Sequence, residues 1–448
     1  MNKRKFYLAL IIFSLVGQIA WVVENMYFNV FIYKMFNASA GDISLMVAAS
    51  AAAATLTTIF IGALSDRLGR RRIFMCLGYV LWGVSIMAFA LVRLDVISAL
   101  FGSAASAASA AVSAVIVLDC VMTFFGSSAN DAAYNAWLTD MTDPTNRGRA
   151  EGINSMMPLV AILAVFGGFM GFDLDKAESW TAIYLVIGAV VLAIGILGFF
   201  IVDEPKVKYP DTLGYFATIF YGFRPGVMRR HAALYFTLAA FVVFNISIQI
   251  FMPYLIIFYE KTLGISNYVL IFAPAIVLAA LFTALYGKYI DRHGFFVSVT
   301  HPLILLMLGY VILWFFTSPY FAKLFPQALG ADNVSFLIPV FIGSLLMLSG
   351  FLSGMAVFGA KIRNETPEAM AGRFQGLRII AQVLIPGVVG PAIGAWVLRD
   401  AETIVNSDGT ESFLPSNAIF IAALIAAAVL AVGLIIAKAV SKKHEKAV

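Results

Sequence analysis

Long runs of apolar residues, separated by short polar segments, dominate the chain. Each run can cross the hydrocarbon core of a bilayer, which takes about 20 residues in a helix. The runs do not alternate apolar and polar residues, as the strands of a membrane β-barrel would. We therefore predict a helical bundle with twelve spans, at residues 6–36, 43–64, 73–92, 108–139, 151–172, 181–202, 232–259, 266–290, 296–317, 335–361, 376–398 and 416–438.

The composition agrees with a membrane protein. Of the 448 residues, 61% are apolar and 12% are charged, whereas soluble domains have roughly 45–50% and about 25%. Too little polar surface exists to coat a water-soluble particle, which excludes soluble DNA-binding proteins and any nucleic-acid partner. The first apolar run is longer than the roughly 7–15 residues of a signal-peptide core. We expect it to be kept as the first span, with the lipid bilayer as the main solvent.

The distribution of basic residues predicts the orientation of the chain. Of the 30 Lys and Arg, the loops on one side hold only Lys34, Arg93, Lys176, Lys261, Lys323 and Arg399. By the positive-inside rule, both termini and a long middle loop face the cytoplasm. We predict a multi-pass protein of the cell membrane, with six-helix bundles at 1–202 and 232–448 and a central loop at 203–231. Within that loop, 211–221 is either a short amphipathic helix on the membrane surface or part of a linker.

An internal repeat relates the two halves. The connection between the second and third spans reads G-x-x-x-D-R-x-G from Gly62 to Gly69, and the one between the eighth and ninth reads the same from Gly287 to Gly294. A second pair precedes the fifth and eleventh spans, at 148–152 and 372–376. Parallel repeats of this kind occur in transporters that bind substrate near the bilayer midplane.

These loops resemble the signature of the major facilitator superfamily, and the resemblance covers the whole chain. It implies an all-α membrane fold with twelve transmembrane helices in two pseudo-symmetric six-helix bundles. It also implies a secondary active transporter that works by alternating access and is not an enzyme. In this family a gating latch is expected in which Asp66 meets the N-terminus of the helix beginning near Arg373, while Arg70 pairs with Asp140.

That latch would stabilise the outward-open state. The second loop has Phe295 at the position of Arg70, so its pairing is not repeated. The predicted gating residues are Gly62, Asp66, Arg67, Gly69, Arg70, Asp140, Gly287, Asp291, Arg292, Gly294, Arg373 and Arg378.

Polar residues inside the first span form a candidate site. At about 100° per residue, Gln18, Asn25 and Asn29 share one face, with Trp21 beside it. Glu24 points away from that face and is expected to meet a neighbouring helix. A carboxyl group in mid-membrane is costly unless it is protonated or paired, and such groups usually serve function. Glu24 is therefore a candidate for proton coupling.

The fourth span adds Asp119 and Asp131, which lie about 18 Å apart along a helix and cannot share one ion. Asp119 is the better coupling candidate, and Asp131 is a candidate partner of Arg378. Tyr134, Asn245, Gln249 and Gln382 carry further polar side chains within predicted spans. The predicted substrate-binding residues are thus Gln18, Trp21, Asn25, Asn29, Tyr134, Asn245, Gln249 and Gln382, although each amide can equally bond a neighbouring helix.

Other functions fit the sequence less well. No phosphate-binding G-x-x-x-x-G-K-[ST] loop occurs. Asn130-Asp131 begins like the aspartate-rich motif of prenyltransferases, but Tyr134 and Leu138 replace its other acids. A channel would need a ring of equivalent groups. We expect no metal and no cofactor, and we expect a monomer.

Two transport functions remain open. The first is proton-coupled uptake of a polar solute such as a sugar or glycoside, for which amides, Trp21 and Tyr134 are suited. The alternative is proton-coupled efflux of drugs or other amphiphiles, for which Glu24 and the many phenylalanines are suited. Sodium coupling is less expected, because the second span lacks the acids of the superfamily's sodium-linked sugar symporters.

Overall fold

The computed structural model describes residues 3–101, 104–142, 146–205, 220–325, 333–366, 371–406 and 409–445. Within these residues, twelve helical segments are long and apolar enough to cross a membrane. They coincide with the twelve predicted runs to within a few residues at each end. The prediction of an all-helical, multi-pass membrane fold is confirmed.

The chain divides into two compact units. Unit 1 comprises Met1–Arg224 and Gln375–Ile379, and unit 2 comprises Pro225–Phe374 and Ile380–Val448. Each unit is considered by itself below.

Unit 1 contains the first six membrane-spanning segments. Its helices are α1 (Lys3–Val22), η1 (Val23–Tyr27), α2 (Phe28–Phe36), α3 (Ala40–Leu68), α4 (Arg71–Ala88), η2 (Phe89–Leu91), α5 (Leu94–Phe101), α6 (Ala104–Gly126), η3 (Ser127–Tyr134), α7 (Asn135–Asp140), α8 (Arg147–Phe169), α9 (Ala177–Ile201) and η4 (Tyr221–Phe223).

Unit 2 contains the other six. Its elements are α11 (Pro225–Arg230), α12 (Ala232–Gln249), η5 (Met252–Tyr254), α13 (Leu255–Ile257), η6 (Phe258–Thr262), α14 (Val269–Arg292), α15 (Phe295–Ser298), α16 (Thr300–Phe316), α17 (Pro319–Leu324), α18 (Val334–Glu365), α19 (Ala371–Ile379, which ends in unit 1), η9 (Ile380–Leu384), α20 (Ile385–Val397), β1 (Thr403–Val405), β2 (Glu411–Phe413) and α21 (Ala418–Glu445).

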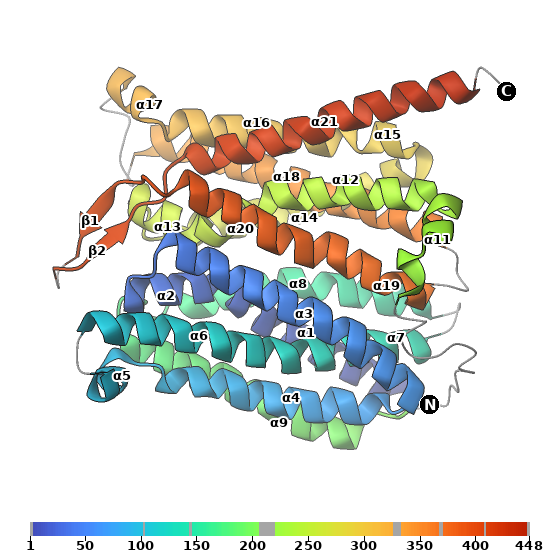
Figure 1. The fold of residues 1–448 in the computed structure, drawn as a ribbon, viewed down its shortest axis with the longest axis horizontal. Coiled ribbons are helices and arrows are strands. Elements are labelled where there is room, and N and C mark those ends of the chain that lie inside the picture. The colour runs from blue at the N-terminus through green and yellow to red at the C-terminus, as the bar shows by residue number, and fades with distance from the viewer. Residues whose placement is uncertain are drawn as a thin grey trace. The chain divides into compact units, whose positions relative to one another are not determined.

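Small residues allow the closest helix contact in unit 1. The helices α4 and α9 run side by side (Figure 1). A Cβ atom added at Gly83 would lie 2.6 Å from the backbone oxygen of Gly188, and one added at Gly188 would lie 2.7 Å from that of Gly83. Only glycine fits at this crossing, as is common where membrane helices meet backbone to backbone.

Two spans of unit 1 are interrupted by π-helical turns, at η1 and η3. Such turns leave carbonyl groups that must be satisfied inside the membrane. Polar side chains at both turns donate to backbone carbonyl groups. The Asn25 amide donates to the carbonyl of Trp21 at 2.7 Å, and the Asn135 amide donates to that of Asp131 at 3.1 Å. The amides therefore have a structural task at the places where the helices widen.

One connection differs from the expectation, and another lies mostly outside the described residues. A short antiparallel hairpin, in which Thr403 pairs with Phe413, projects beyond the end of α20 (Figure 1) and was not foreseen. The helix or linker expected at 211–221 lies outside the described residues, except that Tyr221 begins η4.

Candidate functional site

Glu24 lies inside unit 1 and is only 7% exposed. Its Oε1 atom accepts hydrogen bonds from the Ser50 hydroxyl of α3 at 2.6 Å and from the Thr123 hydroxyl of α6 at 3.0 Å. The two hydroxyl oxygens lie 2.9 Å from each other. The side chain thus contacts two neighbouring helices rather than one.

Asp119 belongs to the same cluster. It lies four residues before Thr123 and therefore on the same face of α6. Its side chain is 2% exposed, and it lies close enough to Glu24 and Ser50 to interact with both. Among the described residues, the groups that interact with Glu24 or Asp119 include no Lys, Arg or His. Two buried acids thus interact with each other inside unit 1.

Asp131 has different surroundings from Asp119. It lies in the π-helical segment η3, where the Ser127 hydroxyl donates to its Oδ2 atom at 2.9 Å. Its charge also acts on Glu24. Its pairing with Arg378 stays a prediction.

A second polar network ties the inner helices of unit 1 together. The Oδ1 atom of Asn154 accepts hydrogen bonds from the Tyr134 hydroxyl at 2.8 Å and from the Ser14 hydroxyl at 2.6 Å. The Tyr79 hydroxyl donates to the carbonyl of Phe13 at 2.7 Å. Tyr134 is predicted to bind substrate, but in this structure its hydroxyl donates a hydrogen bond to Asn154 inside unit 1. Asn154 was not singled out from the sequence.

The residues predicted to share a face of the first span differ in exposure. Gln18 and Trp21 are half-buried, Asn25 is exposed and Asn29 is 1% exposed. The π-helical turn η1 explains the difference, because it departs from the 100° step on which the common face was based. Trp21 packs against Trp82 with ring centroids 5.0 Å apart. The indole N–H of Trp21 and the Oδ1 atom of Asn29 have no hydrogen-bond partner among the described residues.

The predicted binding residues of unit 2 have surroundings that differ from one another. The Asn245 amide is buried and donates to the carbonyl of Phe241 at 2.8 Å. The backbone of Gln249 packs against Gly390, where an added Cβ atom would lie 2.5 Å from the glutamine Cβ. Gln382 is half-buried in η9.

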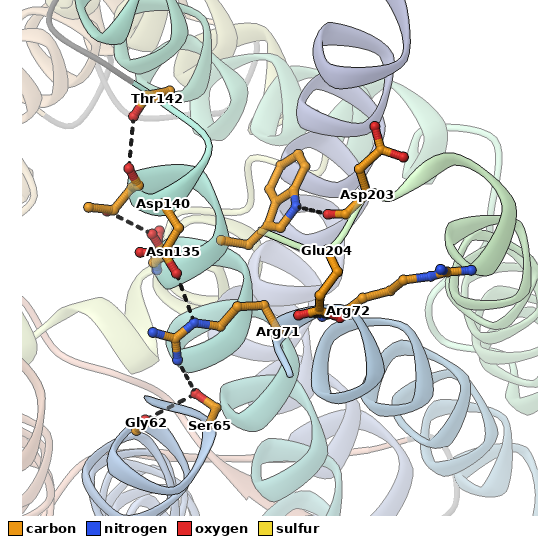
Figure 2. A network of polar contacts seen from close by, with 11 residues as sticks. Gly62, Ser65, Arg71, Arg72, Asn135, Asp140, Thr142, Asp203 and Glu204 are labelled. Carbon is orange, nitrogen blue, oxygen red and sulfur yellow. Dashed lines mark hydrogen bonds and ion pairs between the residues drawn. The ribbon is translucent and has the colours of Figure 1, made fainter. Parts of the chain in front are cut away.

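The signature loop of unit 1 carries a buried ion pair, but with a different arginine from the expected one. Arg71 Nε donates to Asp140 Oδ2 at 3.0 Å, and its Nη1 donates to Ser65 Oγ at 2.6 Å (Figure 2). Both charged side chains are 4% exposed. The predicted pairing of Arg70 with Asp140 is therefore wrong.

The turn geometry explains the change. The helix α3 ends at Leu68, and Gly69 adopts the left-handed conformation with φ +60°. Arg70 is then the exposed residue before α4, while Arg71 begins the helix and points inward. A run of three arginines in sequence does not show which of them faces the bundle.

The same end of unit 1 includes the chain that follows α9. The backbone N–H of Arg72 lies 3.3 Å from each carboxylate oxygen of Glu204, and its guanidinium donates to the carbonyl of Phe199. The indole of Trp137 donates to the carbonyl of Asp203 at 3.0 Å (Figure 2). The start of the middle segment is thus fixed onto the signature loop.

The loop of unit 2 ends differently. Phe295 packs against Phe358 with centroids 5.5 Å apart, and Lys361 lies 5.7 Å above the Phe295 ring. Lys361 also pairs with Glu365 at 2.8 Å. At Phe295, the loop of unit 2 therefore makes a ring contact and a cation–ring contact.

The remaining predicted gating residues differ in their position and exposure. Most of them are exposed at helix ends or in the turns that follow, namely Arg67, Gly69, Arg70, Asp291, Arg292 and Gly294, while Gly62 and Gly287 are half-buried. The side chains of Asp66 and Arg373, which form the expected latch, lie outside the part of the chain that the structure describes.

A small cavity lies at the opposite end of α4 from Arg71. Its lining is mostly aromatic and aliphatic, including Phe31 and Trp180, with Arg93 as its charged group. No predicted substrate-binding residue lines this cavity. Beside it, Arg93 donates to Asp95 at 3.0 Å, and this hydrogen bond holds the pKa of the aspartate below its usual value. Within the described residues, no cluster of three or more His, Cys, Asp or Glu side chains could hold a metal ion.

Comparison with known proteins identifies the architecture. A family model described as Major Facilitator Superfamily matches residues 6–391. Among curated proteins, no match was found. Similar solved structures include a D-xylose-proton symporter, 15% identical, with a TM-score of 0.71 over 96% of this chain and 97% of that chain. A bacterial homologue of the human lysosomal transporter Spinster is 15% identical, with a TM-score of 0.69 over 98% and 97%. The nucleoside transporter NupG is 12% identical, with a TM-score of 0.64 over 97% and 98%. Identities this low show the fold alone.

Proposed function

This chain belongs to the major facilitator superfamily, and from that premise we propose that it imports a small polar solute together with a proton. As a member of the superfamily, it is a multi-pass membrane transporter of small molecules. The solute that we propose is a sugar or glycoside, moved into the cell by alternating access, with both termini facing the cytoplasm.

The buried acid in the first span carries the coupling part of the proposal. Glu24 is bonded by two hydroxyl groups and faces a second acid, Asp119. A membrane protein keeps a carboxyl group at such a position at considerable cost, and proton relays are a common reason. Asp131, with its single serine donor, is the third candidate.

The polar atoms left over in unit 1 support a hydroxyl-rich solute. The indole N–H of Trp21 is a buried donor, and the Oδ1 atom of Asn29 is a buried acceptor, each without a partner among the described residues. Buried polar atoms are normally paired, so these two are suited to a ligand that offers both donors and acceptors. One protein of the same fold is a D-xylose-proton symporter, so the fold is compatible with a solute of this class.

Export of amphiphiles is the alternative, and it was suggested by the 39 phenylalanines. Many of these rings pack against other rings within one unit, as Phe28 does with Phe89 at 4.5 Å and Phe241 with Phe358 at 5.3 Å. Their number is therefore explained in part by core packing. This makes export the weaker proposal.

Transport by proteoliposomes tests the proposal. Labelled sugars, glycosides, nucleosides and a lipophilic cation are offered with an acidic exterior and, separately, without a gradient. We expect a sugar or glycoside to accumulate only when the gradient is present. Expulsion or accumulation of the lipophilic cation alone would favour the alternative.

The variant Glu24→Gln then tests the role of the buried acid. It should lose gradient-driven accumulation and retain exchange of labelled for unlabelled solute, because the pocket stays intact while the carboxyl group that links the first span to α3 and α6 is lost. Glu178→Gln is the matched control, since the Glu178 side chain is 75% exposed. Unchanged gradient dependence in Glu24→Gln would remove Glu24 from the coupling role.

A further inference from the structure

Three oxygen atoms form a tight triangle inside unit 1. Glu24 Oε1 lies 2.6 Å from Ser50 Oγ and 3.0 Å from Thr123 Oγ1, and the two hydroxyl oxygens are 2.9 Å apart. Two hydroxyl groups have only two protons for three close contacts. If both hydroxyl groups donated to an ionised Glu24, neither would have a proton left for a hydrogen bond between the two hydroxyl oxygens. A third proton, carried by Glu24, allows each of the three contacts to be a hydrogen bond.

Asp119 extends the triangle into a site with two carboxyl groups. Its Oδ1 atom and the Oε2 atom of Glu24 are both buried, and neither has a hydrogen-bond partner among the described residues. Carboxylate oxygens accept hydrogen bonds but cannot donate them. Two unpaired acceptors on neighbouring acids are therefore satisfied most simply by a proton.

The surroundings offer little to neutralise a second charge. Among the described residues, the titratable groups that interact with this pair are Asp131 in η3, Cys120 in α6 and Tyr184 in α9. None of these three is cationic. Two adjacent carboxyl groups in such surroundings cannot both be ionised, since each charge opposes the other.

We propose that Glu24, Asp119, Ser50 and Thr123 form one proton-binding site, which exchanges a single proton as a unit while a second proton is retained. The two hydroxyl groups bond whichever carboxyl group has released its proton. The site lies wholly in unit 1, and its hydroxyl members were not predicted to couple transport. This inference rests on the proposed proton-coupled function and specifies its stoichiometry.

Proton counting tests the site without a substrate. Purified protein is moved from about pH 5 to about pH 9, a range in which buried carboxyl groups titrate, and released protons are counted with an indicator dye. Compared with the unmodified protein, the double variant Glu24→Gln with Asp119→Asn should release one proton fewer per chain. Each single variant should release the same number as the unmodified protein, because its remaining acid still exchanges one proton.

Other counts would overturn the proposal. A deficit of two protons in the double variant, with one in each single variant, would show two independent acids. No deficit in the double variant would show that the pair does not exchange a proton. Proton release on adding sodium chloride, but not choline chloride, at constant pH would show a sodium site instead. The thermal midpoint of every variant shows whether it is folded.

Infrared difference spectra test the hydroxyl groups. The acid-minus-alkaline spectrum should contain the C=O band of a carboxylic acid that is absent from the double variant. Ser50→Ala should shift this band, whereas Ser128→Ala should not, because Ser128 donates only to the carbonyl of Phe124. An unshifted band in Ser50→Ala would remove Ser50 from the site.

The two proposals can fail separately. A one-proton deficit in a protein whose transport ignores the proton gradient would refute the proposed function and leave the site intact. Gradient-driven transport in a protein with a deficit of two protons, or of none, would refute the site alone.

Discussion

The two units share a signature loop but differ in what they bury. In the repeat, a shift of 224 residues takes Glu24 to Ile248 and Asp119 to Gly343. The same shift takes their hydroxyl partners Ser50 and Thr123 to Pro274 and Met347. Every polar member of the cluster is thus matched by an apolar residue or glycine. Helix packing needs only small and apolar residues and can be repeated, whereas the proposed proton site belongs to one unit.

The loops themselves show a second difference. In unit 1 the loop ends in a buried ion pair between Arg71 and Asp140. In unit 2 it ends in Phe295, which packs against Phe358 below a partly exposed Lys361. Removing one partner of a buried ion pair lowers the stability of the protein strongly, while a partly exposed cation above a ring contributes little to stability. The basic loop of unit 1 should therefore be the more sensitive of the two.

The largest effect on stability is expected at Arg71. Arg71→Ala should destabilise the protein by about 3–5 kcal/mol, because it removes the arginine partner of the buried carboxylate of Asp140. The measurement is thermal unfolding in detergent. The neighbouring Arg70→Ala is the control and should change stability by no more than about 0.5 kcal/mol, since Arg70 is exposed. Equal losses at both positions would contradict the assignment of the pair to Arg71.

A smaller effect is expected where the middle segment meets unit 1. Trp137→Phe should cost about 1 kcal/mol, because the carbonyl of Asp203 loses its indole donor while the ring still packs against Phe6. Trp396→Phe is the control, as Trp396 is 65% exposed. Chemical unfolding of the three proteins in parallel measures the difference. No loss in Trp137→Phe would mean that this hydrogen bond does not fix the segment.

The smallest effect is expected in unit 2. Lys361→Met should cost about 0.5 kcal/mol, since both of its interactions are made by a side chain that is 35% exposed. The same thermal assay applies, with the unmodified protein as reference. A loss as large as that of Arg71→Ala would show that the two loops are equivalent, and the contrast between them would be wrong.

The fold could be predicted almost fully from the sequence. Membrane spans can be recognised by their length and hydropathy, and the paired loops at Gly62 and Gly287 indicated the repeat. The hairpin at 403–413 was missed because it lies in a polar connection without a strong strand pattern. The π-helical turns at η1 and η3 were missed because hydrophobic periodicity does not show where a helix widens.

The candidate site could be predicted only in part. Glu24 and Asp119 stand out as acids in apolar runs, which a one-dimensional pattern reveals. Ser50 does not stand out, because it is one serine in an alanine-rich run, and only folding brings it to Glu24. Likewise, the left-handed conformation of Gly69, rather than any property of the arginines, selects Arg71 over Arg70. Hydrogen-bond and ion-pair partners that only tertiary folding brings together cannot be recognised from the local sequence.

The central claim is that the coupling proton is bound in unit 1 and not in unit 2. Proton flux driven by substrate, read with a pH-sensitive dye inside proteoliposomes, tests it most directly. Glu365 of unit 2 is the matched acid, as it accepts from Thr237 at 2.7 Å and pairs with Lys361. We expect the double variant Glu24→Gln with Asp119→Asn to abolish the flux and Glu365→Gln to keep it. Flux that survives in the double variant and disappears in Glu365→Gln would contradict the account.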